Sequence, residues 1–124
     1  MRRSRSTTAT GREGEEAAAR FLLAQGYRIL ARNVRFRSGE IDLVALHEGC
    51  LVFIEVKTRR GTGYGTAAEA VTRQKQQQLI RLATLYLAGL PSQDRACRFD
   101  VVTVERGTSG EWVCTLIPNA FTAG

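Results

Sequence analysis

The first apolar pattern along the chain has the period of a helix and covers residues 12–24. Its apolar positions recur at the spacing of one helix face: Ala17, Ala18, Phe21, Leu22 and Leu23. Three glutamates lie in the first turn, where the helix dipole favours acidic side chains. Gly26 suits a C-terminal cap. The pattern therefore predicts an amphipathic helix that ends before Gly26.

The pattern then changes to alternation, which is typical of strands. Over residues 27–36, apolar Tyr27 and Ile29 alternate with arginines, so one side of this strand is expected to be basic. Residues 40–46 and 51–57 predict two further strands, because they are rich in β-branched and apolar residues. The short polar segment between these two strands predicts a hairpin loop.

A second helical pattern follows Thr72, which is a suitable N-cap. Its apolar face consists of Leu79, Ile80, Ala83, Tyr86, Leu87 and Leu90. Residues 99–104 and 112–117 predict two closing strands, and Asp100 is expected to make a structural hydrogen bond within the first of them. The expected order α-β-β-β-α-β-β indicates an α/β fold, a mixed β-sheet flanked by helices.

The length of 124 residues suits one domain. We expect a disordered basic arm over residues 1–10, a folded domain over residues 11–118 and a C-terminal tail over residues 119–124. No apolar run approaches the roughly 20 residues of a membrane helix. The basic N-terminus lacks the apolar stretch of a signal peptide, and three widely spaced cysteines suit a reducing compartment. A cytoplasmic protein with no membrane partner is expected.

The formal charge of +6 is concentrated at one end of the chain. Residues 1–37 contain nine arginines and three glutamates, whereas basic and acidic residues balance over residues 38–124. Such asymmetry favours a polyanionic partner such as nucleic acid, because binding to phosphates releases condensed counterions. A solvated basic surface that only maintains solubility explains the charge equally well.

The candidate chemistry lies in the two strands of the predicted hairpin. Residues two apart share a face of a strand, so Glu40 lies beside Asp42, and Glu55 beside Lys57. If the loop is centred on residues 48–49, Asp42 faces Glu55 and Glu40 faces Lys57. Side chains that face each other in an antiparallel pair have Cβ atoms about 4.5–5.5 Å apart. Two carboxylates are therefore expected to meet in the sheet.

Facing carboxylates repel each other unless a cation lies between them. Oxygen ligands suit Mg²⁺ or Mn²⁺, and the carbonyl of Val56 could supply a further ligand. Lys57 could orient a metal-bound water or neutralise the transition state. Glu40 either joins the metal ligands or pairs with Lys57. The spacing also fits a solvated polar face in which Glu40 and Lys57 form an ordinary salt bridge.

Five longer blocks add to this pattern, and they occur in the order Gly11-Arg-Glu-Gly14-Glu15, Gly39-Glu-Ile-Asp-Leu43, Phe53-Ile-Glu-Val-Lys-Thr-Arg59, Thr72-Arg-Gln-Lys75 and Cys97-Arg-Phe-Asp-Val-Val102. With these blocks the chain resembles the YraN-like family of uncharacterised bacterial proteins over residues 11–118. That family is similar to archaeal Holliday-junction resolvases and, more distantly, to the PD-(D/E)xK nucleases. The resemblance implies a restriction-endonuclease-like fold.

The resemblance also implies roles for individual residues. Asp42 matches the metal-binding aspartate, Glu55 the second metal ligand and Lys57 the catalytic lysine. Glu15 matches a glutamate that approaches the metal from the first helix, and we expect Glu16 to be a surface residue. The implied activity is metal-dependent endonucleolytic hydrolysis of phosphodiester bonds in DNA, at branched or otherwise irregular structures.

Nucleic-acid contacts are expected on both sides of this site. Gln74 and Lys75 begin the second helix, where free N–H groups can hold a phosphate. Arg59 and Arg60 follow the catalytic strand and could contact the nucleic-acid backbone. The related resolvases act as two-fold dimers, so a homodimer is left open. A non-catalytic nucleic-acid-binding or interaction protein that retains the fold is the alternative to an enzyme.

Overall fold

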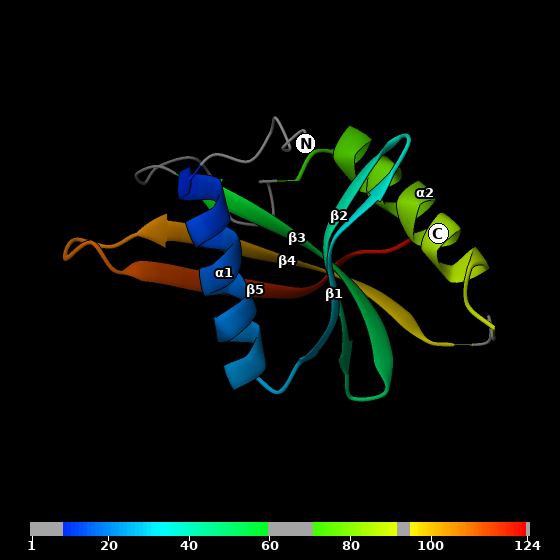
Figure 1. The fold of residues 1–124 in the computed structure, drawn as a ribbon, viewed down its shortest axis with the longest axis horizontal. Coiled ribbons are helices and arrows are strands. Elements are labelled where there is room, and N and C mark those ends of the chain that lie inside the picture. Colours follow the sequence, from blue (N-terminus) through cyan, green and yellow to red (C-terminus); the bar gives the residue numbers. More distant parts are fainter. Residues whose placement is uncertain (1–8, 60–70, 92–94, 124) are drawn as a thin grey trace.

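A computed structural model describes residues 9–59, 71–91 and 95–123 of the chain (Figure 1). Its elements in chain order are α1 (Ala9–Ala24), β1 (Arg28–Phe36), β2 (Gly39–His47), β3 (Cys50–Arg59), α2 (Arg73–Ala88), β4 (Cys97–Arg106) and β5 (Trp112–Phe121). The strands form one sheet in the order β1-β2-β3-β4-β5, and only β3 and β4 are parallel neighbours. The mixed α/β fold and the predicted element order are confirmed. No helix of the described ranges is long and apolar enough to cross a membrane.

Within the described ranges, one helix covers each face of the sheet. In β3, Val52 and Ile54 pack in the cluster that contains α1, whereas Leu51 and Phe53 pack in the cluster that contains α2. Successive strand residues point to opposite faces, so the two helices lie on opposite sides of β3. Burial on both faces explains why this strand is a continuous apolar run rather than an alternating one.

The first turns of α1 lie very close to the sheet at Gly14. A Cβ atom at this position would lie 3.0 Å from Oγ1 of Thr58 on β3 and 3.0 Å from Cγ2 of Val104 on β4. Any larger residue would push these neighbours or the helix outward. Gly14 therefore sets the distance at which the next residue, Glu15, stands from the sheet.

The register of the β2–β3 hairpin agrees with the prediction over five pairs, from Leu43 opposite Ile54 to His47 opposite Cys50. The two loop residues, Glu48 and Gly49, have φ values of 52° and 78°, as a type I′ hairpin turn requires. Beyond Leu43 the regular pairing ends, and β2 turns away from β3 toward α2 (Figure 1). The sheet therefore opens at the level of Asp42.

The termini of the fold extend further than the sequence indicates. Helix α1 begins at Ala9 instead of residue 12, and β5 continues to Phe121 instead of ending at Ile117. Residues 119–121, assigned above to a tail, thus belong to β5. An edge strand tolerates Pro118, because no neighbour needs its missing N–H group. Residues 1–8, most of the predicted arm, lie outside the described residues.

Asp100 joins several elements through a buried polar cluster. Its carboxylate accepts hydrogen bonds from the Tyr27 hydroxyl at 2.6 Å and from two nitrogens of Arg98 at 2.9 Å. It also accepts one from the backbone N–H of Asn119 at 2.9 Å, which ties β5 to β4 beyond Pro118. Since Asp100 is 1% exposed and fully bonded, it has the structural role expected for it.

Candidate functional site

Asp42 stands where β2 and β3 separate. Its Oδ2 atom accepts a hydrogen bond of 2.8 Å from the backbone N–H of Val56, a group that regular pairing would have joined to the backbone of β2. The carboxylate therefore occupies the opening of the sheet and is fixed against β3. The residue before Val56 on this strand is Glu55.

Asp42 and Glu55 form an electrostatically coupled pair. Burial is the largest cause that raises the pKa of Asp42, and the negative charge of Glu55 raises it further, against the effect of the Val56 N–H group. Burial also raises the pKa of Glu55, whose side chain is 12% exposed. The nearby ammonium groups of Lys75 and Lys57 and a hydrogen bond with Asp42 oppose that rise. The pair therefore favours sharing a proton when no cation is bound.

Glu15 and Glu40 complete an acidic cluster around Asp42. One carboxylate oxygen from each of these three residues lies within 4.8 Å of the others. Oxygen ligands lie about 2.0–2.6 Å from Mg²⁺ or Ca²⁺, so oxygens separated by this distance can share one ion. A hollow of about 210 Å³ adjoins the cluster, and it is lined by Arg12, Glu15, Glu16, Arg32, Asn33, Asp42 and Leu43.

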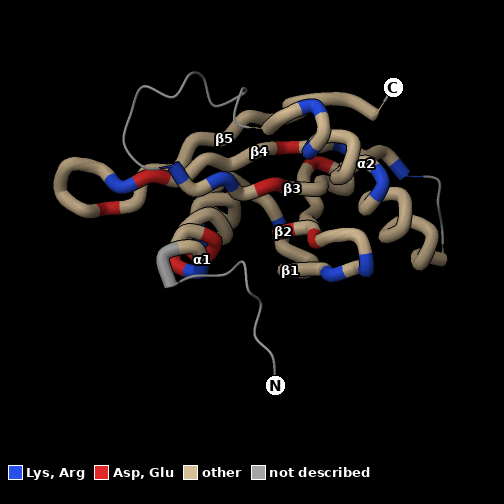
Figure 2. Tube along the Cα trace, turned by 90° about the horizontal axis from the view of Figure 1, so that it is seen from above, with Lys and Arg blue, Asp and Glu red and all other residues tan. Residues whose placement is uncertain are grey.

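The ligand set that the structure brings together overlaps the predicted one without matching it. Asp42 and Glu15 belong to both sets. Glu55 was predicted as a ligand, and it lies close enough to Asp42 and Glu15 for their charges to interact. The compact cluster contains Glu40 in its place. Figure 2 shows that acidic positions of α1, β2 and β3 surround this region.

Glu40 does not pair with Lys57, the alternative offered by the hairpin pattern. It accepts a hydrogen bond from Arg35 at 3.1 Å, and the two residues are directly opposite each other on β1 and β2. The separation of β2 from β3 is the physical reason. Lys57 shares a strand face with Glu55 instead and is exposed.

The two adjacent glutamates of α1 have different environments. Glu15 lies with Asp42, whereas Glu16 forms an ion pair of 2.8 Å with Arg32 and a longer one with Arg20. These cations lower the pKa of Glu16. The helix therefore presents one glutamate to the cluster and the other to arginines.

Asn33 is the residue of this site that sequence reasoning missed. Its amide nitrogen donates to Glu15 at 3.3 Å and to Glu40 at 3.0 Å. It lies between the paired residues Arg32 and Val34, opposite Asp42, and has a φ of 50°. Asparagine is rare in strands but tolerates this left-handed conformation, so its place in an alternating strand was the available signal.

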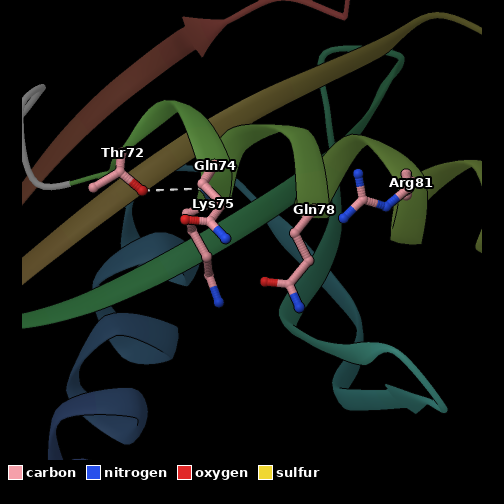
Figure 3. A pocket seen from close by; sticks show the side chains of 5 residues that line it. All are labelled: Thr72, Gln74, Lys75, Gln78 and Arg81. Carbon is pink, nitrogen blue, oxygen red and sulfur yellow. Dashed lines mark hydrogen bonds between the residues drawn. The ribbon is translucent and has the colours of Figure 1, made fainter.

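Lys75 reaches the acidic pair from the other face of the sheet. Thr72 caps α2 by accepting a hydrogen bond of 3.2 Å from the backbone N–H of Lys75. The Lys75 side chain extends away from the helix (Figure 3), and its Nζ atom lies 3.9 Å from Oε2 of Glu55. Glu55 is thus accompanied by two lysines, one from its own strand and one from α2.

The other predicted contact residues are more scattered. Gln74 is exposed and lines a second hollow on the side of α2. Arg59 is half-buried at the end of β3. Arg60 lies outside the described residues. The structure therefore places Lys75 beside Glu55 and Gln74 at the second hollow.

The sequence matches a family profile described as "Uncharacterised protein family UPF0102" over residues 14–104. A UPF0102 protein of Symbiobacterium thermophilum is 66% identical over 113 residues, which cover 91% of this chain and 96% of the relative. One of Chlorobaculum parvum is 56% identical over 101 residues, covering 82% and 78%. One of Frankia casuarinae is 51% identical over 117 residues, covering 94% and 99%. The names of the family and of these relatives state no biochemical activity.

Proposed function

The chain belongs to the uncharacterised protein family UPF0102, and we propose that it is a metal-dependent endonuclease that hydrolyses phosphodiester bonds in DNA. The proposal includes a restriction-endonuclease-like fold, in which a mixed sheet opens between two strands to form the active site. Asp42, Glu55 and Lys57 are the proposed catalytic residues, and Mg²⁺ or Mn²⁺ is the proposed cofactor.

The observation that carries this proposal is the pair formed by Asp42 and Glu55 at the opening of the sheet. Two half-buried carboxyl groups in contact lower the stability of a fold at neutral pH, because burial and mutual repulsion both disfavour their charges. Such an arrangement is typical of functional sites. It is readily explained if a cation binds there.

The donor set fits a hard divalent ion. Asp42, Glu55 and Glu15 are the proposed carboxylate ligands, and Glu40 is near enough to join them. The N–H and C=O groups of one strand residue point toward the same neighbouring strand, so the carbonyl of Val56 faces the opening together with its N–H. A bound Mg²⁺ or Mn²⁺ would lower the pKa of a water ligand and stabilise negative charge on a phosphate.

The side chains around the proposed metal position act on the phosphodiester group. Hydrolysis forms a bond from a water oxygen to phosphorus, breaks the bond from phosphorus to a sugar oxygen and transfers a proton to that oxygen. The ammonium group of Lys57 donates hydrogen bonds to the phosphate oxygens as their charge increases. Asn33 keeps Glu15 and Glu40 side by side through its two hydrogen bonds.

DNA of branched or irregular structure is the proposed substrate. The net charge of +6 favours a polyanion, and no sequence-reading motif such as a zinc finger accompanies the site. Recognition by backbone charge and shape is consistent with both features. The resemblance to junction resolvases supports the same substrate.

A cleavage assay tests the proposal. Duplex, single-stranded, flapped and four-way DNA are incubated with the protein in Mg²⁺ or Mn²⁺, and Asp42→Asn is tested in parallel. We expect the wild type to cleave at least one substrate and the variant, with its hydrogen bond to Val56 retained, to cleave none. Equal cleavage by both proteins would reject the site. If the wild type cleaves nothing in either metal, the non-catalytic nucleic-acid-binding alternative replaces the nuclease.

A further inference from the structure

A second hollow lies along the polar face of α2, on the side where Lys75 reaches Glu55. It has a volume of about 340 Å³ and is lined by Thr72, Gln74, Lys75, Gln78 and Arg81. Figure 3 shows these side chains along one side of the helix, with Lys75 and Gln78 extending away from it. Lys75, Gln78 and Arg81 follow one another at three-residue steps, which keeps them on neighbouring turns of one helix face.

The charged side chains of α2 are all positive. Residues 71–91 contain Arg73, Lys75 and Arg81 and no acidic residue. Arg81 is exposed, and within the described ranges no ion pair joins it to an aspartate or glutamate. An exposed guanidinium of this kind is suited to a phosphate, which it can bind through two parallel hydrogen bonds.

Gln78, in the middle of this helix face, joins α2 to the β1–β2 turn. The Gln78 amide nitrogen donates a hydrogen bond of 2.9 Å to the carbonyl of Ser38 in that turn. This contact fixes α2 against the hairpin that carries Asp42, so the hollow and the acidic site have a defined relative position. Lys75 is the residue common to the two regions.

The length of the face suits a nucleic-acid backbone. Lys75 and Arg81 are separated by six residues, about 9 Å along a helix axis. Successive phosphates of one DNA strand advance about 3.4 Å along the duplex axis. Because the strand also winds around that axis, its phosphates lie farther apart along the backbone, and the face spans about two of them.

We propose that this hollow binds the sugar–phosphate backbone of one DNA strand next to the reacting phosphate, with Lys75 at the end near Glu55 and Arg81 at the far end. The choice of DNA as the polyanion rests on the proposed nuclease function. The contacts are to the backbone, so they add affinity without sequence preference.

The test is equilibrium binding of a short fluorescein-labelled single strand and the matching duplex in EDTA, where no cleavage occurs. The variant is Arg81→Gln, and the matched control is Arg95→Gln, which removes the same charge from the exposed segment before β4, outside the basic first third of the chain. Circular dichroism verifies that both variants fold. We expect Arg81→Gln to weaken binding about five- to tenfold and to reduce the slope of log affinity against log salt by about one. Arg95→Gln should change neither quantity appreciably.

Two results would overturn the proposal: equal weakening by both substitutions, which indicates only a net-charge effect, or wild-type binding that Arg81→Gln leaves unchanged. Absence of binding by the wild type would overturn it as well. The nuclease proposal is judged separately by Asp42→Asn. Cleavage without an effect of Arg81→Gln rejects the hollow alone, and an effect of Arg81→Gln without cleavage rejects catalysis alone.

Discussion

At the scale of single residues, the site depends on which way each acidic side chain points. The alternation of the strands predicted that Asp42 and Glu55 would be close, and their coupled charges agree with this. Strand alternation could not predict the partner of Glu40, because this partner is Arg35 of β1, which lies outside the β2–β3 hairpin. Asn33 was missed for the same reason: its two hydrogen bonds reach α1 and β2, which no local pattern relates.

The adjacent glutamates of α1 provide a matched pair of substitutions. Glu15→Gln removes a carboxylate from the cluster around Asp42, so we expect affinity for Mn²⁺ to fall about 10- to 100-fold. Glu16→Gln breaks only exposed ion pairs with arginines, which solvent screens, and should leave Mn²⁺ affinity unchanged. Isothermal titration calorimetry measures both variants. Equal losses would mean that the helix does not orient Glu15 toward the metal.

At the scale of elements, the positions and types of the seven helices and strands in the described residues followed from the sequence pattern, as did the register of β2 and β3. The opening between β2 and β3 could not be predicted in this way, because the twist of a sheet and the divergence of its strands depend on what packs against each face. The end of β5 was also misjudged. The strand was expected to end at Ile117, but the Asn119 N–H donates to Asp100 of β4, a contact that only the folded sheet provides.

Gly14 tests how closely α1 must approach the sheet. Helix propensity alone predicts that Gly14→Ala stabilises the protein by about 1 kcal/mol. A Cβ atom would lie 3.0 Å from both Thr58 and Val104, so we expect a net destabilisation of about 1–3 kcal/mol instead. Displacement of α1 should also weaken Mn²⁺ binding through Glu15. Urea unfolding gives the stability, and a gain in stability would contradict the close contact.

At the scale of the whole molecule, the acidic site is expected to lower stability when it is empty. A carboxyl group whose pKa is higher in the folded than in the unfolded chain favours folding while it is protonated. For Asp42 this contribution is fully present below the ordinary value of 3.8 and is lost as the pH rises toward about 8. The same site should stabilise the fold once a cation binds to it.

The effect of the Asp42 carboxyl group on stability can be measured from the pH dependence of unfolding in EDTA. We expect the wild type to lose stability between about pH 4 and pH 8, and Asp42→Asn to lose about 1–3 kcal/mol less over that interval, because asparagine does not ionise. Urea denaturation at several pH values gives both curves. Parallel curves for the two proteins would show that Asp42 has an ordinary pKa and is not held in a buried acidic pair.

The metal site at Asp42 is tested most directly by Mn²⁺ binding. Electron paramagnetic resonance at pH 8 measures this binding for the wild type, Asp42→Asn and Glu16→Gln. We expect the wild type and Glu16→Gln to bind Mn²⁺ alike and Asp42→Asn to lose this binding. Equal binding by Asp42→Asn and the wild type, or no binding by the wild type at millimolar Mn²⁺, would contradict a metal site at the opening between β2 and β3.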